Sequence, residues 1–237
     1  MAAQPATGTV TAFTFKAAVY FYNGTPQGEL GTLSTVARRS DGTTVEIVSQ
    51  GPSQIQKNIN TRTIRYIDGS TVRLLDAAKA KSTLPPHGAK MWQRIVFHPP
   101  SNCLYPAETL IREDAGKVLG QAVVEIRPPA PDGYRITSWV APGLGCEVLT
   151  YHTEKKQPDG TYTLASEQKP LSLQIGEPAS ALFAPGNGYA EMAPSEFGRR
   201  LRALLGSSAP LSVSPSMARA DNDYHTLWAQ YPDWQGH

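Results

Sequence analysis

The chain has 237 residues, of which 40% are hydrophobic, and it contains 20 prolines and 20 glycines. That length allows one large β domain or two small ones, and it suffices for a sizeable core without metal or several disulfides. Its 22 basic and 20 acidic side chains leave a formal net charge of +2. Composition therefore gives no reason to expect nucleic acid or an anionic membrane as a partner. No apolar run reaches the roughly 18 residues that a membrane-spanning helix needs.

The first residues, Met1–Ala6, have neither the basic stretch nor the apolar stretch of a signal peptide. Two readings remain open at this point. The protein is cytosolic, or it is periplasmic or secreted and its signal peptide has been removed. Residues 1–9 are expected to form a flexible lead.

One pattern recurs four times: an alternating strand, an Asp-Gly pair and a second alternating strand. The repeats span Val36–Val48, Arg62–Leu75, Val123–Val140 and Cys146–Leu164, with the pairs at Asp41-Gly42, Asp68-Gly69, Asp132-Gly133 and Asp159-Gly160. Asp-Gly between alternating apolar runs is a strong hairpin signal, because both residues tolerate a positive φ, and it predicts type I′ turns, which require that conformation. The pattern predicts a mainly β protein with a strongly curved antiparallel sheet, a half-barrel, and a few short helices.

A first strand precedes these hairpins, and a period of two places its apolar residues on one face. That face carries Phe13, Phe15, Ala17, Val19 and Phe21. The second hairpin offers another apolar face. We predict that both faces line a groove for an apolar ligand, with the ligand-binding residues Phe13, Phe15, Val19, Phe21, Ile64, Tyr66, Val72 and Leu74. Arg65 and Arg73 alternate with the second set, and they are expected to form a solvated face; the alternative is a basic ligand-binding row.

The remaining segments are predicted as follows. Residues 50–60 form a polar loop, and residues 76–92 form an irregular segment. Residues 107–115 form a short helix that Pro106 begins and Gly116 ends. Leu171, Leu173 and Ile175 belong to a last strand.

A second helix is predicted over residues 196–205, with Ser195 capping its start and Gly206 its end. Its apolar face carries Phe197, Leu201, Leu204 and Leu205. Residues 10–206 are thus expected to form a single β-rich domain. Residues 207–237 follow as a linker and an aromatic tail, which docks on the body or binds a partner.

Cys103 and Cys146 are the two cysteines of the chain. They are read either as two buried thiols or as one disulfide, and we predict the disulfide. A disulfide would favour an oxidising compartment. The absence of a Cys-x-x-Cys motif argues against thioredoxin-like redox chemistry.

The sequence contains no catalytic motif and no metal-binding motif. The five histidines form neither an H-x-H pair nor an H-E-x-x-H pair, and no G-x-S-x-G sequence occurs. Gly186-Asn187-Gly188 lacks the lysine and the hydroxyl residue of a phosphate-binding loop. We therefore predict no catalytic residues, no metal site and no cofactor.

The stretch 139–196 carries a resemblance. Its motifs are Trp139-Val-Ala-Pro142-x-Leu144-x-Cys146, Gly176-Glu177-Pro178, Leu182-Phe183 and Gly188-Tyr189. They resemble uncharacterised secreted bacterial proteins that are distantly similar to the outer-membrane lipoprotein localisation carriers, and the resemblance covers roughly residues 10–198. It implies a half-open β barrel whose mouth is plugged by helices and whose cavity holds acyl chains.

These observations lead to one expected function and two alternatives. We expect a periplasmic or secreted protein that binds a lipid or a lipidated protein in a half-barrel groove, without catalysis. The first alternative is a hydrolase that acts on the cell envelope. The second is a structural interaction module that uses the aromatic tail.

Overall fold

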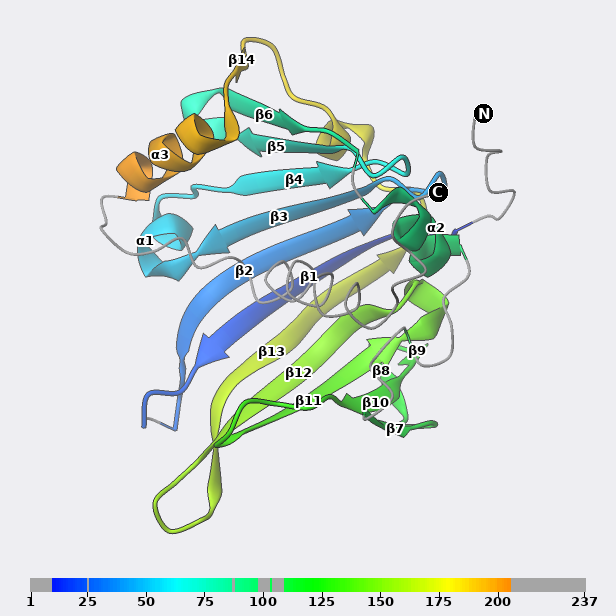
Figure 1. Ribbon diagram of the computed structural model, residues 1–237, viewed down its shortest axis with the longest axis vertical. Helices are drawn as coiled ribbons and strands as arrows, with labels where there is room; N and C mark the ends of the chain where they lie inside the picture. The colour runs from blue at the N-terminus through cyan, green and yellow to red at the C-terminus, as the bar shows by residue number, and fades with distance from the viewer. Residues whose placement is uncertain (1–9, 25, 87, 98–102, 104–108, 206–237) are drawn as a thin grey trace.

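The computed structural model describes residues 10–205, apart from residues 25, 87, 98–102 and 104–108. Within that part of the chain, twelve strands form one sheet in the order β14-β6-β5-β4-β3-β2-β1-β13-β12-β11-β10-β7 (Figure 1). Its neighbouring strands are antiparallel, except that β14 and β6 are parallel. The predicted fold class is confirmed. The predicted flexible lead, linker and aromatic tail lie outside the described residues.

Short helices interrupt the succession of strands. In chain order the elements are β1 (Phe13–Phe21), β2 (Glu29–Arg38), β3 (Thr44–Gln50), α1 (Gly51–Gln56), β4 (Thr61–Arg65), β5 (Thr71–Leu75), η1 (Asp76–Ala78), β6 (Ala80–Leu84), α2 (Ala89–Phe97), β7 (Leu110–Arg112), β8 (Lys117–Val118), β9 (Gln121–Ala122), β10 (Val124–Arg127), β11 (Tyr134–Ala141), η2 (Pro142–Leu144), β12 (Glu147–Lys156), β13 (Tyr162–Ile175), η3 (Ser180–Phe183), β14 (Ala190–Glu191) and α3 (Pro194–Leu205). Strands β8 and β9 form a separate two-stranded sheet.

The sheet consists of two meanders joined at its centre. Strands β1 to β6 follow one another in space as they do in sequence, and β10 to β13 do the same. The two meanders meet where β1 pairs with β13, from Phe13 opposite Ile175 to Phe21 opposite Ser166. Figure 1 shows β1 and β13 in the middle of the molecule, with one meander on either side. This long-range pairing places the first strand at the centre of the fold.

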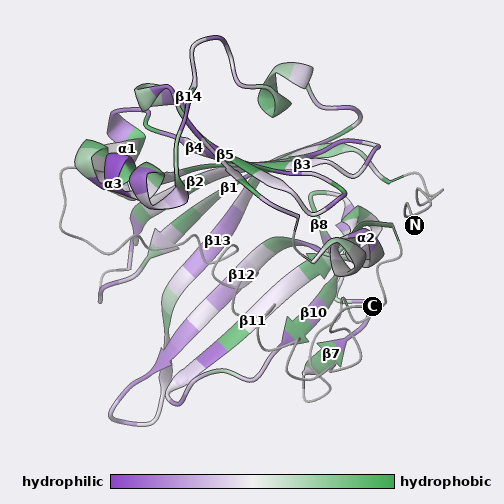
Figure 2. Cartoon of the chain, turned by 45° about the horizontal axis from the view of Figure 1, so that its top comes forward, coloured by the Kyte–Doolittle hydropathy of each residue, from purple (hydrophilic) through white to green (hydrophobic). Residues whose placement is uncertain are grey.

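The sheet bends strongly about this centre (Figure 2). Strands β1 and β13 lie between β2 and β12, so β2 and β12 would be about 14 Å apart along a flat sheet. Yet Nη2 of Arg38, at the end of β2, lies 3.8 Å from a carboxylate oxygen of Glu147, at the start of β12. The face that carries these two side chains is therefore the concave one.

All four Asp-Gly hairpins are confirmed, but the turns are not of the expected type. The backbone φ is positive at Gly42, Gly69, Gly133 and Gly160, whereas it is not at the preceding aspartates. In the first turn the N–H of Gly42 donates to O of Arg39, and the N–H of Arg39 donates to O of Thr43. This is a three-residue loop in which a type I turn precedes a glycine in the left-handed region. Type I′, which needs two positive φ values, does not occur in it.

Replacing Gly69 with valine is expected to lower the free energy of unfolding by about 1–3 kcal/mol. The φ of Gly69 is 82°, and a β-branched residue resists that conformation. Urea unfolding of the two proteins measures the effect. Gly143→Val is the matched control, because an added Cβ at Gly143 meets nothing within 4 Å and its φ is not positive. Equal losses in the two variants would contradict the prediction.

Three segments differ from their sequence-based assignment. Residues 110–112, predicted to be helical, form β7, because Leu110–Arg112 pair with Glu125–Arg127 of β10. The expected polar loop at 50–60 contains α1, and the expected irregular segment contains β6 and the start of α2. The backbone pairing that a neighbouring strand offers overrides a weak local helical pattern.

The predicted helix is present as α3, but it begins at Pro194, so Ser195 lies within it and does not cap its start. Gly206 lies outside the described residues. Phe197 and Leu201 are buried against Leu75 and Ala80 of the sheet. No helix in the described ranges is long and apolar enough to cross a membrane.

Candidate functional site

The pairing register defines the concave face residue by residue. Phe13 lies opposite Arg38, and Phe15 lies opposite Val36. Because directly opposed residues point to the same side of a sheet, the apolar row of β1 shares the concave face with Arg38. The concave face thus combines an apolar floor with a charged group.

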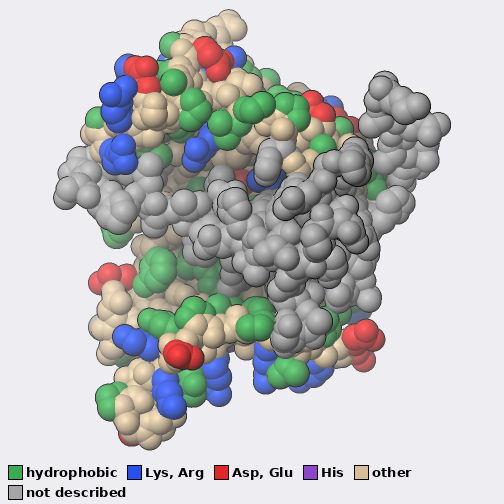
Figure 3. Space-filling model, viewed as in Figure 1, with side chains coloured by type: hydrophobic (Ala, Val, Ile, Leu, Met, Phe, Trp, Pro, Cys, Tyr) green, Lys and Arg blue, Asp and Glu red, His purple; other side chains and the backbone are tan. Residues whose placement is uncertain are grey.

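The apolar floor follows the whole of β1. Phe13, Phe15, Ala17 and Val19 are buried, whereas Phe21 at the end of the row is 39% exposed. The buried end packs against a cluster made up of Val123, Ala141, Leu144 and Leu149. Figure 3 shows further hydrophobic side chains gathered just below the middle of this side of the molecule. The predicted alternation of the first strand is confirmed.

The second predicted set lies on the opposite, convex face. Ala37, the neighbour of Arg38 in β2, pairs with Val45, Val45 with Ile64, and Ile64 with Val72. Ile64 and Leu74 are fully buried in a cluster with Phe183 of η3, and Tyr66 and Val72 pack against that cluster. The structure therefore does not bring these residues together with the row of β1, and ligand binding is retained below as a proposal for β1 alone.

Arg62 holds the segment that covers the convex face. Its Nη1 donates to O of Ala181, Leu182 and Ala184 at 3.3–3.4 Å, and its Nη2 donates to Oδ1 of Asp76 at 2.7 Å. Tyr189 hydrogen-bonds the same carboxylate. These bonds tie η3 to β4 over the buried face of Ile64, which identifies the convex cluster as core.

Arg38 was not singled out from the sequence, yet it is buried on the concave face at the Phe13 end of the apolar row. Only 3% of its side chain is exposed. Its Nη1 donates to O of Leu144 at 2.6 Å and its Nε donates to Oγ1 of Thr44 at 3.2 Å. The guanidinium lies 5.2 Å from the ring centre of Phe13 and 5.8 Å from that of Trp92 in α2. The sequence could have indicated this position, because Arg38 follows Val36 by two residues and alternate residues of a strand point to the same face.

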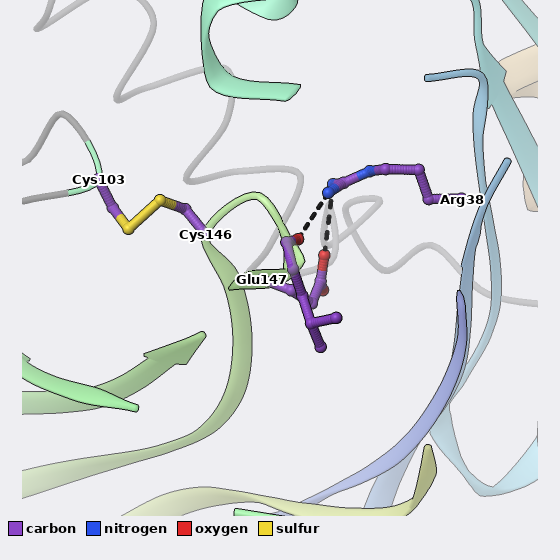
Figure 4. Close-up of a disulfide and its surroundings, with 5 residues drawn as sticks. Arg38, Cys103, Cys146 and Glu147 are labelled. Atoms are coloured by element: carbon purple, nitrogen blue, oxygen red, sulfur yellow. Dashed lines mark hydrogen bonds and ion pairs between the residues drawn. A yellow bond between two sulfur atoms is a disulfide. The ribbon is translucent and has the colours of Figure 1, made fainter. Parts of the chain in front are cut away.

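Figure 4 shows Arg38 reaching across to η2 and the start of β12, beside the bond between Cys103 and Cys146. The predicted disulfide is confirmed, with Cα atoms 5.5 Å apart, within the usual range. Cys146 directly precedes Glu147 and follows Leu144 by two residues. The disulfide therefore anchors the loop that supplies the partners of Arg38.

The Glu147 carboxyl is a weak partner for this arginine. Burial raises its pKa from 4.5 to about 7; the charge of Arg38 opposes that shift, and the charge of Glu46 adds to it. Burial also lowers the pKa of Arg38. The pair is thus a desolvated contact in which the carboxyl is partly protonated near neutral pH.

Glu147 should make stability depend on pH. Because its folded-state pKa lies above that of an unfolded glutamate, the folded protein binds more protons between about pH 4.5 and 7. Stability contributed by this site is therefore present at the acid end and lost as pH rises through that window. We expect wild type to lose roughly 2–3 kcal/mol relative to Glu147→Gln between pH 5 and pH 8. Urea unfolding of both proteins at the two pH values measures this difference, and a constant difference would contradict it.

Arg65 and Arg73 also lie on the concave face. Thr44, opposite Arg38, pairs on its other side with Arg65, and Thr63 pairs with Arg73. The Arg65 guanidinium lies 5.0 Å from the ring centre of Trp92, and that of Arg73 lies 5.7 Å from the ring centre of Phe197. The expectation of a solvated face is corrected, because both side chains pack on aromatic rings of α2 and α3.

A surface pocket of about 600 Å³ lies at the far end of the sheet, between residues 128–130 and β11. Its charged side chains already have partners: Arg135 pairs with Glu154 at 3.1 Å and lies 3.8 Å from the ring centre of Tyr162. Arg127 pairs with Glu125 at 2.7 Å. The described residues contain no group of three or more side chains that could hold a metal ion.

No protein-family model and no curated protein matches this chain. Among solved structures, it is similar to an uncharacterized conserved protein from Thermus thermophilus, at 8% identity and a TM-score of 0.46 over 78% of this chain and 91% of that one. It is also similar to a putative outer membrane lipoprotein-sorting protein domain from Vibrio parahaemolyticus, at 12% identity and a TM-score of 0.28 over 81% of this chain and 91% of that one. Likeness at this level is a distant resemblance of fold.

Proposed function

We propose that this protein binds an apolar ligand, an acyl chain or the acyl part of a lipidated partner, on the concave face of its sheet and without catalysis. The observation that carries the proposal is the apolar row of β1, which runs along the concave face from the buried Phe13 to the exposed Phe21. Apolar ligand surface buried along this row would contribute roughly 25 cal/mol per Å² before the entropic cost of association.

A periplasmic or secreted location belongs to the same proposal. The disulfide between Cys103 and Cys146 is compatible with an extracytoplasmic location, since disulfides persist in oxidising compartments. Fractionation of the native host, followed by detection of the protein, tests the location independently of the ligand.

Binding is tested in two steps. The full chain is purified, extracted with organic solvent and analysed by mass spectrometry, and a fluorescent fatty acid is then titrated against the extracted protein. We expect co-purified acyl compounds and saturable probe binding. An empty protein that hydrolyses cell-envelope substrates would replace the proposal by the hydrolase alternative.

Two matched variants locate the binding face. Phe21→Gln changes the exposed end of the concave row, and Lys16→Gln changes an exposed residue on the convex face of the same strand. We expect Phe21→Gln to weaken probe binding at least threefold and Lys16→Gln to leave it unchanged, at equal melting temperatures. Equal probe affinity in wild type and both variants would place the ligand elsewhere and overturn the proposal.

A further inference from the structure

Charge on the described concave strands is unevenly distributed. Arg38, Arg65 and Arg73 lie on this face in β2, β4 and β5. Glu46 of β3 lies opposite Val36 and so shares the face, and Glu147 reaches it from β12. Glu29 of β2, opposite Phe21, lies on this face as well, at the exposed end of the row. Around the buried end, the three cations face Glu46 and Glu147, and the Glu147 carboxyl is partly neutral near pH 7. The concave face therefore carries a net positive charge beside the buried end of its apolar floor.

The most buried of these cations, Arg38, has only a distant counter-charge among the described residues. A guanidinium that is 97% withdrawn from water, as the 3% exposure of Arg38 implies, requires an anion at hydrogen-bond distance to offset its desolvation. Within the part of the chain that the structure describes, the nearest carboxylate oxygen belongs to Glu147 and is 3.8 Å away. The closer acceptors, O of Leu144 and Oγ1 of Thr44, are neutral. The Arg38 guanidinium can therefore still pair with a second oxyanion at a shorter distance than that of Glu147.

Arg38 lies at one end of the apolar row, so an anion that pairs with it would sit beside that row. Its guanidinium lies over the ring of Phe13, the first residue of the row, and Phe15, Ala17 and Val19 lead away from it along β1. A ligand whose headgroup met Arg38 would lay its chain along these residues. The arrangement of one cation at the end of one apolar row matches an amphiphile with one charged end.

We propose that the ligand of the concave face is an anionic amphiphile, whose oxyanion headgroup pairs with Arg38 while its acyl chain lies on β1. This inference rests on the proposed function and adds the headgroup chemistry to it. A guanidinium binds carboxylate and phosphate oxygens in the same forked geometry. In the bound state the headgroup takes the place of the distant Glu147 as counter-charge.

The test compares headgroups on one chain. Oleate, oleoyl lysophosphatidate and the uncharged oleyl alcohol are each titrated against delipidated full-length protein, below their aggregation concentrations, by displacement of the fluorescent probe. We expect at least one of the two anionic ligands to bind about tenfold more tightly than the alcohol, as for a hydrogen bond to a charged group. The anion that binds more tightly identifies the headgroup as carboxylate or phosphate.

Variants assign the effect to Arg38. Arg38→Met should remove the tenfold preference, and Arg39→Met, the neighbouring residue on the other face, should retain it. Glu147→Gln removes the competing carboxylate. It should tighten binding of the anionic ligand about threefold or more and leave binding of the alcohol unchanged. If Arg38→Met does not fold, this variant decides whether Arg38 binds the headgroup.

Failure of this inference is distinguishable from failure of the proposed function. Equal affinity for the three ligands, or an anion affinity that Glu147→Gln leaves unchanged, overturns the headgroup assignment and leaves acyl-chain binding intact. Absence of saturable binding by all three ligands and by the probe overturns both.

Discussion

Replacing Phe15 with alanine is expected to lower the free energy of unfolding by about 3–5 kcal/mol. Phe15 is 2% exposed and belongs to the cluster that Leu144 and Leu149 complete. Truncation removes its transfer free energy and leaves a cavity that a sheet held by neighbours on both sides cannot close. Urea unfolding monitored by circular dichroism measures the loss.

Phe21→Ala is the matched control, because it makes the same change in the same row at a position that is 39% exposed. We expect a loss of about 1 kcal/mol there. A similar loss for both variants would mean that the row is buried uniformly. A loss below about 1 kcal/mol at Phe15 would mean that its ring lines a cavity rather than the core.

The gradient between the two positions bears on the proposed function. The Phe13–Phe15 end of the row supports the fold, while the Phe21 end is accessible to a ligand. Variants at Phe21 should therefore change binding with little change in stability. Variants at Phe15 should lower stability, and they should also weaken binding because Phe15 lies next to the proposed headgroup site.

Removing the disulfide, in the double variant Cys103→Ser with Cys146→Ser, is expected to lower the free energy of unfolding by about 4 kcal/mol. The bond joins residues 43 positions apart, and opening that loop restores conformational entropy to the unfolded chain. Urea unfolding of oxidised wild type and the double variant measures the difference.

Reduction provides the control for this prediction. A reductant should destabilise wild type by a similar amount and have no effect on the double variant, which excludes an effect of the serines themselves. A difference below about 1 kcal/mol would show that the unfolded chain is already compact around this loop. Since the disulfide anchors the loop of Leu144 and Glu147, its loss should also weaken binding of the anionic headgroup that is proposed to pair with Arg38.

Much of the fold could be predicted because its signals are local. The Asp-Gly turns, the alternation of β1 and the apolar face of α3 each depend on residues within a few positions of one another, where turn geometry and side-chain periodicity act directly. The turn type was mispredicted because Asp-Gly serves both type I′ turns and type I turns followed by a left-handed glycine. The backbone φ of the aspartate and the hydrogen bonds of the turn distinguish them.

The sequence by itself determined which residues alternate and where the chain turns. It did not determine on which side of the sheet the apolar face of each strand lies. Ile64 and Phe13 are equally apolar, yet the register between β2, β3 and β4 places them on opposite sides of one sheet. The same holds for residues 110–112, which became a strand because β10 offered its edge. Arg38 became a buried group of the concave face only because the sheet bends and brings Glu147 within 3.8 Å across two intervening strands. Register and curvature arise from pairing between distant segments, and those long-range contacts leave no local pattern in the chain.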